Sequence, residues 1–443
     1  MCAHPARLHV VHCIDTEGPL TESVSDTFKR LHTIFGLEIE PTAKNLRALQ
    51  TRQISLGGIE DQVARVVAPS LLAYNESWRD IEAMLEEAMS PEFRREMVDS
   101  SGRGWVYSWH CMDHAGYADN PRRKDLGFGN VFRFYRDAVR ERPASGDELN
   151  WHYHPLSFSR DPLQCATNYV NSYDVLNQVL CRRVIDEGWF PSANRPGFHT
   201  ERPDIHLFLE QWIPFDYANQ SREAGDDGQP DLVQGRFGDW RRAPLSWGGY
   251  QPSHDDHQVP GNCRRWIFRC LNVGTRFREL SLNHVEQAFQ EAGESGSAIL
   301  AFANHDYRDI RPDVRRVREL LGTARAKYPE IQVSFSGAAE AARQHLGLKR
   351  HLDGEKLAFT AAVEGCHLHV RVTRGRLFGP QPYLALRTHQ GTYHHDNFDV
   401  QIPGRHYTYT FDQHTIALEN VRFIGVASAG RCGHTEVVTL SPK

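Results

Sequence analysis

The chain has 443 residues, of which 40% are apolar and 24% charged, and its formal net charge is −5. This composition is typical of a globular protein with ample material for a core, and it excludes a disordered tail, a fibrous repeat and a small disulfide scaffold. No stretch approaches ~18 consecutive apolar residues, so we expect no membrane span. The isoelectric point near 6.6 argues against nucleic acid or an anionic membrane surface as a partner.

The cysteines and the first residues indicate a reducing compartment. The nine cysteines include no CxxC pair, which argues against disulfide staples and against a structural zinc knuckle. The first residues do not resemble a signal peptide, because the apolar run at 8–14 is short, holds histidines and leads into acidic residues. We therefore expect a cytoplasmic protein, and nothing in the sequence indicates its oligomeric state.

Short apolar segments alternate with amphipathic helical segments over the first 345 residues. The predicted strands cover 8–14, 104–112, 148–154, 264–273, 297–306 and 331–336. The predicted helices cover 78–98, 130–141, 169–188, 202–212, 284–293, 311–329 and 338–347. Repeated β–α alternation is typical of a parallel sheet covered by helices, and seven or eight such units would close into a distorted (β/α) barrel.

A second domain is predicted after the barrel. Residues 349–356 are polar and read as a linker, and the segment 366–373 then alternates strictly between apolar and polar residues. Further short strands separated by turns follow, which predicts a small antiparallel β-sandwich. We expect domains at 1–348 and 355–443 with separate hydrophobic cores, and a sandwich that packs on the barrel rather than binding glycan.

Three long segments do not fit the alternation of short strands and helices expected of a barrel: 18–75, 116–130 and 219–262. Long insertions in a compact domain are often lids or binding loops. Plain surface decoration is an equally good interpretation of each, and the sequence leaves the choice open.

Polar residues gather where the predicted strands end. Active sites of parallel α/β domains lie at the carboxyl ends of the strands. The residues at or just after these ends are Asp15, Glu17, Asp113, His114, His152, His154, Arg195, His199, Asp216, His305 and Asp306. Several of them on one rim would form a mononuclear metal site with an acid/base pair.

His152 and His154 are the predicted metal ligands. They are two residues apart, so on a regular strand their side chains point the same way. With Asp15 or Glu17 as the anionic partner they would bind one divalent ion, most plausibly zinc, and leave coordination positions open for water and substrate. A single H-x-H pair is otherwise an ordinary, partly exposed strand end.

The remaining rim residues have candidate catalytic roles. Of Asp15 and Glu17, one could bind metal while the other acts as base, although a helix N-cap would also explain them. His305 could be a general acid, because imidazole titrates near neutral pH, or a satisfied buried histidine. Arg195 could hold a catalytic carboxylate ionised, or form a surface salt bridge of little value.

The order of these motifs resembles the NodB-like polysaccharide deacetylase superfamily, which comprises carbohydrate esterase family four and its relatives. The motifs are Asp-x-Glu, a histidine pair followed by proline, Arg-Pro-Gly, Phe-Asp-Tyr and a strand that ends in His-Asp, and they span about residues 8–345. The resemblance implies a distorted (β/α)7 barrel that uses a divalent metal to remove acetyl groups from sugars. The nearest relatives would belong to a subgroup associated with bacterial surface-polysaccharide gene clusters.

The resemblance also implies roles for individual residues. Asp15 would be the catalytic base and Glu17 a metal ligand. Arg195 would orient the base, and His305 would be the general acid. The family's histidine pair corresponds to His152 and His154, and Asp15 could also contact the metal.

This chain departs from the family pattern at two motifs. The histidine spacing is H-x-H, with Asn150 at the position four before His154, where the family has His-x-x-x-His. The second acid is Glu17 rather than aspartate, so its carboxylate reaches one methylene further.

The sequence therefore predicts a metal-dependent hydrolase that removes an N-acyl group from a sugar, with a pH–rate profile that rises and then falls as Asp15 and His305 titrate. Substrate contacts are expected from Asp113, His114, Trp151, His199, Asp216 and Asp306. A few of the tryptophans would stack on sugar rings, namely among Trp109, Trp151, Trp189, Trp212, Trp240 and Trp247. Two alternatives stay open: a non-catalytic carbohydrate-binding or assembly protein on the same scaffold, and a metal-dependent amidase for a non-sugar amide.

Overall fold

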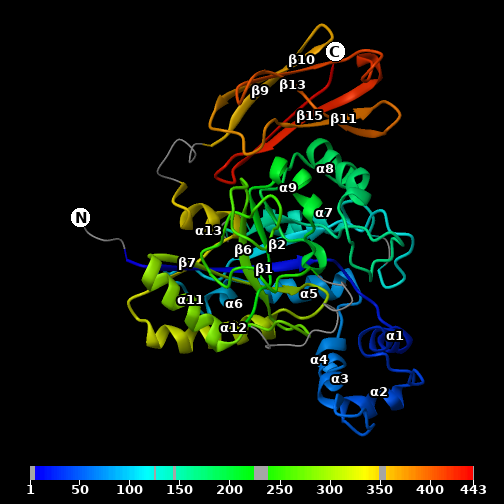
Figure 1. Ribbon diagram of the computed structural model, residues 1–443, viewed down its shortest axis with the longest axis vertical. Helices are drawn as coiled ribbons and strands as arrows, with labels where there is room; N and C mark the ends of the chain where they lie inside the picture. Colours follow the sequence, from blue (N-terminus) through cyan, green and yellow to red (C-terminus); the bar gives the residue numbers. More distant parts are fainter. Residues whose placement is uncertain (1–4, 124–125, 143–145, 224–237, 349–355, 443) are drawn as a thin grey trace.

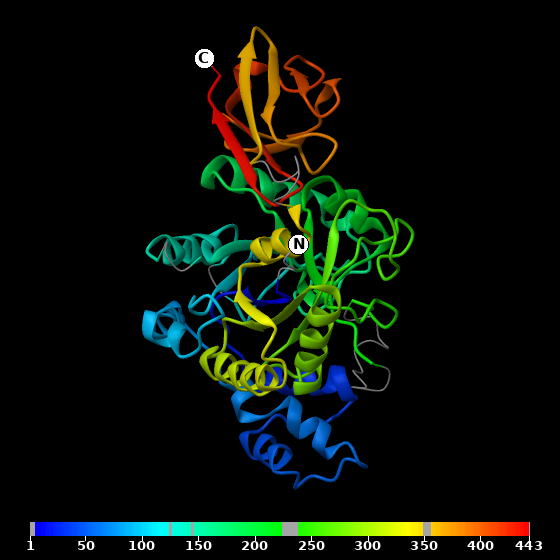
Figure 2. The same cartoon turned by 90° about the vertical axis from the view of Figure 1, so that its left-hand side faces the viewer.

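The computed structural model describes residues 5–123, 126–142, 146–223, 238–348 and 356–442. The predicted linker lies outside the described residues, apart from its last position. Figure 1 and Figure 2 agree that the β-sandwich and a group of N-terminal helices, α1–α4, lie at opposite ends of the molecule, with the barrel between them.

Seven parallel strands, β1 among them, form a closed barrel. They are β1 (Arg7–Thr16), β2 (Tyr107–Met112), β3 (Glu148–His152), β4 (Ala193–Asn194), β5 (Phe215–Asn219), β6 (Trp266–Asn272) and β7 (Ser297–His305). Closure comes from β1, which pairs with both β2 and β7. An eighth strand, β8 (Gln332–Phe335), pairs with the first half of β1, whereas β2 pairs with the second half. The prediction of a parallel (β/α) barrel is confirmed.

Helices cover the barrel where the sequence predicts them, with small differences. They are α5 (Trp78–Ala88), α6 (Pro91–Arg95), α7 (Asn130–Arg140), α8 (Tyr173–Glu187), α9 (His206–Trp212), α11 (Leu282–Ser295), α12 (Arg311–Lys327) and α13 (Ala338–His345). The helix expected over 78–98 is two helices, because Pro91 cannot continue a helix and instead begins the second one. No helix in the described ranges is both long and apolar enough to cross a membrane.

The long segment after β1 is a folded helical unit. It contains α1 (Val24–Phe35), α2 (Ala43–Gln50), α3 (Glu60–Val66) and α4 (Pro69–Leu72), around a small apolar cluster that includes Phe28, Leu31, Leu49 and Val63. Phe277, from the loop after β6, packs against this cluster. The unit is therefore tied to the rim of the barrel.

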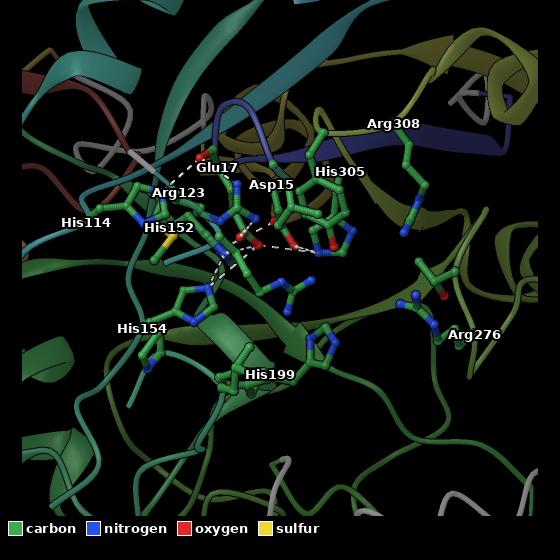
Figure 3. Close-up of a pocket in the computed structure, with 18 of the residues that line it drawn as sticks. Asp15, Glu17, His114, Arg123, His152, His154, His199, Arg276, His305 and Arg308 are labelled. Carbon is green, nitrogen blue, oxygen red and sulfur yellow. Dashed lines mark hydrogen bonds and ion pairs between the residues drawn. The ribbon is translucent and has the colours of Figure 1, made fainter. Parts of the chain in front are cut away.

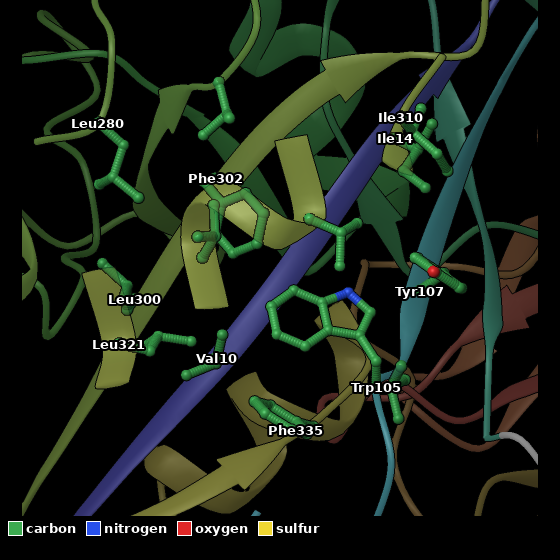
Figure 4. Close-up of a cluster of buried hydrophobic side chains, with 14 of the residues drawn as sticks. Val10, Ile14, Trp105, Tyr107, Leu280, Leu300, Phe302, Ile310, Leu321 and Phe335 are labelled. Atoms are coloured by element: carbon green, nitrogen blue, oxygen red, sulfur yellow. The ribbon is translucent and has the colours of Figure 1, made fainter. Parts of the chain in front are cut away.

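The two faces of β1 face two different cores. Leu8, Val10 and Ile14 belong to the large cluster between the strands and the outer helices, together with Trp105 and Phe302 (Figure 4). Val11 and Cys13 belong to the cluster inside the barrel. Side chains alternate along a strand, so Asp15 shares the face of Val11 and Cys13 and projects into the upper end of the barrel interior.

The C-terminal part is a two-sheet sandwich, as predicted. One antiparallel sheet has the order β13 (Asp399–Ile402), β14 (His406–Thr410), β10 (His367–Arg374), β9 (Ala358–Glu364). The other has the order β12 (Tyr393–Asp396), β11 (Tyr383–Thr388), β15 (Val421–Ala429), β16 (Thr435–Leu440). Leu368, Val370, Leu384, Leu386 and Val426 lie in the core between the sheets.

The barrel and the sandwich each have a core of their own, and a further buried cluster is shared by both. Val184 of α8 and Trp212 of α9 are buried with Tyr383 and Ala385 of β11. The rings of Trp212 and Tyr383 meet edge to face with their centroids 5.2 Å apart. The apolar face of α8 is covered by the sandwich, which sequence periodicity cannot distinguish from a face covered by the barrel itself.

Candidate metal centre

A cavity of about 210 Å³ opens at the carboxyl ends of the barrel strands. Its walls come from the ends of β1, β3 and β7, from the loops after β2, β4 and β6, and from the α1–α4 unit. Asp15, Glu17, His152, His154 and His305 all line it (Figure 3). These five of the strand-end residues predicted to form one site therefore meet.

Glu17, His152 and His154 form a group with the geometry of a metal site. Their candidate ligand atoms all lie within 4.8 Å of one another. The Nε2 atoms of the two histidines are 3.0 Å apart, and Glu17 Oε1 lies 3.9 Å from that of His152 and 3.8 Å from that of His154. The prediction that both imidazoles point to one place is confirmed, in spite of the altered spacing.

The surroundings of the histidines suit a metal ligand. Nδ1 of His152 lies 2.5 Å from the carbonyl oxygen of Arg195, so Nδ1–H donates there and Nε2 keeps its lone pair. Burial lowers the pKa of His152 to about 4 and that of His154 to about 3. Both rings are then neutral at pH 7, which is the form that binds a metal ion.

The Arg-Pro-Gly motif shapes the space around His154. A Cβ atom on Gly197 would lie 2.1 Å from the ring of His154, so no other residue leaves room for this imidazole. The next two residues, Phe198 and His199, have φ values of 53° and 52°, which are rare for residues other than glycine. Backbone strain of this kind concentrates at functional sites.

Asp15 is held between a cation and two imidazoles. Arg195 Nη1 donates a short hydrogen bond to Asp15 Oδ2, and both side chains are 1% exposed. His152 Nδ1 lies 3.5 Å from Oδ1, and His305 Nε2 lies 3.7 Å from Oδ2. Burial raises the pKa of Asp15, while the charge of Arg195 opposes this rise. A carboxylate with a raised pKa is a stronger proton acceptor.

The surroundings of Glu17 shift its pKa in the opposite direction from that of Asp15. Burial alone would raise its pKa, but Arg123, which forms an ion pair with Glu17 Oε2, and the neighbouring imidazoles outweigh burial and hold the pKa below its usual value. Glu17 is thus firmly ionised, as a metal ligand must be. Two carboxylates whose surroundings push their pKa values apart are typical of a site with divided roles.

His305 differs from the expectation that it titrates near neutral pH. Its Nε2 lies 3.7 Å from both Asp15 Oδ2 and Glu17 Oε1. Burial nevertheless lowers the pKa of His305 to about 3, against the effect of the two carboxylates. The imidazole is therefore neutral at pH 7, and any proton that it delivers must first be transferred to it.

Asp113 and Asp216, expected to bind substrate, are not among the residues that line the cavity. Asp113 accepts hydrogen bonds of 2.7 and 2.8 Å from Arg183, and Asp216 accepts one of 3.1 Å from Arg265. Each carboxylate is buried beside a guanidinium that pairs with it, although Oδ1 of Asp216 has no hydrogen-bond partner among the described residues. Both residues hold neighbouring segments together.

Asp306 is likewise not among the residues that line the cavity, and it supports the site through the turn after β1. Its carboxylate accepts hydrogen bonds from the backbone N–H groups of Glu17, at 2.8 Å, and Gly18, at 3.0 Å. The hydroxyl of Tyr135 donates a third, at 2.9 Å. Asp306 therefore fixes the turn that carries Glu17 instead of contacting substrate.

The expected tryptophan platforms are absent from the lining of this cavity. Trp151, for example, packs on Tyr153 and Phe208 in the cluster shared with the sandwich. The aromatic residues that do line the cavity are Tyr74, Tyr117, Phe198, Phe277 and Tyr307. His114 and His199 line it as predicted, and His114 Nε2 lies 2.8 Å from the carbonyl oxygen of Glu17.

Several residues of the cavity carried no sequence signal. Arg123 comes from the loop after β2, and it donates to Glu17 and to the carbonyl oxygen of Gly18 at 2.9 Å. Arg30, Arg276 and Arg308 come from the helical unit and from loops. Arg276 and Arg308 stand three or four residues beyond their strands, at positions that no motif marks, and the adjacent arginines at 122–123 were a visible hint only for Arg123.

A second group of metal-ligand types lies apart from the cavity. His206, Glu210 and Cys263 are all buried, and their candidate ligand atoms also lie within 4.8 Å of one another. Glu210 already accepts hydrogen bonds from the backbone N–H groups of Arg264 and Arg265. Any metal analysis of this protein must separate the two groups.

No family model matches the chain, and no curated protein matches it.

Proposed function

We propose that this protein is a metal-dependent hydrolase of the NodB-like type, which removes an N-acyl group, such as acetyl, from a sugar of a polysaccharide or glycoconjugate. One observation supports this above the others. Two carboxylates from the end of β1, Asp15 and Glu17, have opposite electrostatic settings and lie beside two neutral imidazoles. That combination supplies a base and an anionic ligand in one cavity.

Glu17, His152 and His154 would hold a divalent ion. Two nitrogen ligands and one oxygen ligand favour zinc among the common ions and leave positions open. When bound, the ion supplies Lewis-acid polarisation of the acyl carbonyl and a lowered pKa for a water molecule. The protein's part is to keep the ligand atoms in place, which the hydrogen bond from His152 to the carbonyl of Arg195 does.

Asp15 acts as the base. Its buried carboxylate takes the proton of the attacking water, and its raised pKa makes this transfer easier. Arg195 fixes the orientation of the carboxylate and opposes its protonation before the reaction begins. Arg195 is in turn directed by Asn272, whose side-chain oxygen accepts from Nη2 at 3.3 Å.

His305 passes the proton to the leaving nitrogen. Because its imidazole starts neutral, it receives the proton from Asp15, whose Oδ2 is 3.7 Å from His305 Nε2. The amine then departs with that proton, and the acyl group remains as acetic acid, which loses its own proton to water as acetate. Base and acid thus share one proton, which enters from water and leaves with the product.

The direct test combines metal analysis with acetate release. Purified protein should contain zinc and release acetate from N-acetylated oligosaccharides, and His152→Ala should lose both. Cys263→Ser is the matched control, because it alters the second group only. Metal retained in His152→Ala and lost in Cys263→Ser would contradict the proposed centre. Hydrolysis of simple anilides but of no sugar would favour the non-sugar amidase, and bound metal without any hydrolysis would favour a binding protein.

A further inference from the structure

Two arginines lie in the same cavity as the proposed metal ligands but away from them. Arg276 follows β6 and Arg308 follows β7, and both line the cavity. Figure 3 shows the two side chains on the same side of the cavity, beyond His305 as seen from His154. A substrate whose acyl group lies at the histidines would therefore extend toward these guanidinium groups.

Neither arginine has a carboxylate partner among the described residues. Arg276 donates to the carbonyl oxygen of Val66 at 3.0 Å and to the hydroxyl of Tyr74 at 3.3 Å. Arg308 is 6% exposed, and its guanidinium lies 4.9 Å from the ring centroid of Tyr307. Burying a cation costs free energy unless an anion compensates it.

The neighbouring carboxylates provide only part of that compensation: Glu22 lies within electrostatic reach of Arg276 and Asp313 within reach of Arg308, but neither forms an ion pair with it among the described residues. Arg30 and Arg122 line the same wall, and both pair with the single carboxylate of Glu22. Nη1 of Arg30 is buried and has no hydrogen-bond partner. Burial, followed by the charges of Arg30 and Arg308, lowers the pKa of Arg276 to about 10, so it still carries its charge at pH 7. This wall therefore has a surplus of positive charge.

The other cavity arginines provide a contrast. Arg123 is neutralised by Glu17, and Arg195 is neutralised by Asp15. The surplus is confined to the part of the wall that carries Arg30, Arg122, Arg276 and Arg308. Guanidinium groups bind the oxygens of carboxylates and phosphates through paired hydrogen bonds.

We infer that Arg276 and Arg308 bind an anionic group of the substrate, either a carboxylate or a phosphate. The inference rests on the proposed function and narrows its substrate to an N-acylated sugar that carries negative charge. A uronic acid and a sugar phosphate share this chemistry. A neutral N-acetylhexosamine would leave the positive wall uncompensated and would bind more weakly.

Binding of simple anions tests the inference separately from hydrolysis. Calorimetric titrations of the chelator-treated and the zinc-loaded protein would use inorganic phosphate, glucuronate and, as the neutral control, glucose. We expect at least one anion to bind in both states and glucose not to bind. The tighter anion identifies the source of the charge. Binding that needs zinc would place the anion on the metal instead, and no binding by either anion would overturn the inference.

Variants then locate the anion. Arg276→Gln and Arg308→Gln should each weaken anion binding roughly 10- to 100-fold, the usual size for a hydrogen bond to a charged group. Arg316→Gln, an exposed arginine of α12 that pairs with Glu319, is the control and should change nothing. If a glutamine variant fails to fold, the matching lysine variant keeps the charge and should bind with intermediate affinity. Unchanged affinity in folded Arg276→Gln and Arg308→Gln would contradict the assignment.

Activity gives a third readout. On an N-acetylated uronic acid, or on the corresponding sugar phosphate, Arg308→Gln should raise KM with little change in kcat. On the neutral N-acetylhexosamine, which has no anionic group for Arg308 to bind, the rise in KM should be clearly smaller. Equal losses on charged and neutral substrates would overturn the inference. Hydrolysis of neither by the unaltered protein, together with anion binding, would count against the proposed function and leave the anion site standing.

Discussion

The barrel rim and the β-sandwich bury different kinds of side chain. At the rim, Asp15 and Arg195 are each 1% exposed, and buried polar atoms such as Asp15 Oδ1 and His305 Nδ1 have no hydrogen-bond partner. In the sandwich, the buried side chains are almost all aliphatic or aromatic, and the few polar ones are uncharged, such as Thr388 and Ser428. Burial therefore costs free energy at the barrel rim, where charged groups are buried, and much less in the sandwich, where the buried groups are mostly apolar.

The difference indicates where function lies. Unsatisfied or charged groups in a protein interior cost free energy, so an interior rich in them must be retained for a reason other than stability. Every described residue that lines the cavity with Glu17, His152 and His154 falls between 15 and 308, that is, within the barrel domain. We therefore expect substitutions at the rim to change chemistry and substitutions in the sandwich to change stability.

The largest effect should come from His152→Ala. Removing this ligand leaves too few donors to hold a divalent ion. Loss of the ion should remove several kilocalories per mole of transition-state stabilisation, or roughly three orders of magnitude in turnover. Metal content measured by mass spectrometry should fall toward zero, whereas the melting temperature of the chelator-treated protein should match that of the chelator-treated unaltered chain. Full metal occupancy would exclude this histidine from the centre.

His305→Ala should follow, with metal retained and turnover reduced by roughly two to four orders of magnitude, the usual size of general acid–base catalysis. An acetate ester with a good leaving group needs little protonation, so its hydrolysis should suffer less than that of the amide. Equal losses on ester and amide, or loss of metal, would show that His305 is a ligand or a structural residue. His199, which also lines the cavity, would then be the next candidate for the acid.

In the sandwich, Leu386→Ala should lower the free energy of unfolding by ~2–5 kcal/mol, because it removes buried methyl groups from between the sheets. Chemical denaturation would measure this loss. The kcat/KM of the folded protein should stay within experimental error, since none of the described sandwich residues lines the cavity of the proposed metal site. A large fall in kcat/KM at low denaturant would remove the distinction between the two regions.

The smallest expected effect concerns pH. Asp15 must be ionised to act, and its pKa is raised, so kcat/KM should rise with pH through that ionisation and then level off. His305 is already neutral above a pKa of about 3 and therefore adds no fall between pH 6 and 8, in contrast to the rise and fall expected from the sequence. The profile should be recorded with metal content at each pH. A fall centred near pH 6.5 would mean that His305 acts in its protonated form.

The sequence predicted the parts of the fold that carry a strong local signal. Apolar runs such as 8–14 and 297–306 are strands, and their parallel arrangement brings Asp15, His152 and His305 to one rim. Strands β4 and β5 are short and bounded by loops, so no periodicity marks them. Their positions follow from pairing with neighbours that are distant in sequence.

The sequence predicted which residues stand at the strand ends, but not where their side chains point or which loop residues join the site. Asp306 follows β7, but its side chain turns back to the backbone of Glu17 and Gly18, a choice that depends on the turn after β1. Arg276 and Arg308 lie on loops, where local sequence says nothing about which cavity a side chain reaches. The tertiary fold decides both cases.

The apolar contact between α8, α9 and β11 also affects how the molecule can be divided. A chain cut after residue 348 would present Val184 and Trp212 to water, because Tyr383 and Ala385 now cover them. Exposed apolar patches of this kind promote self-association. The barrel alone should therefore aggregate when expressed, although its catalytic residues are all present.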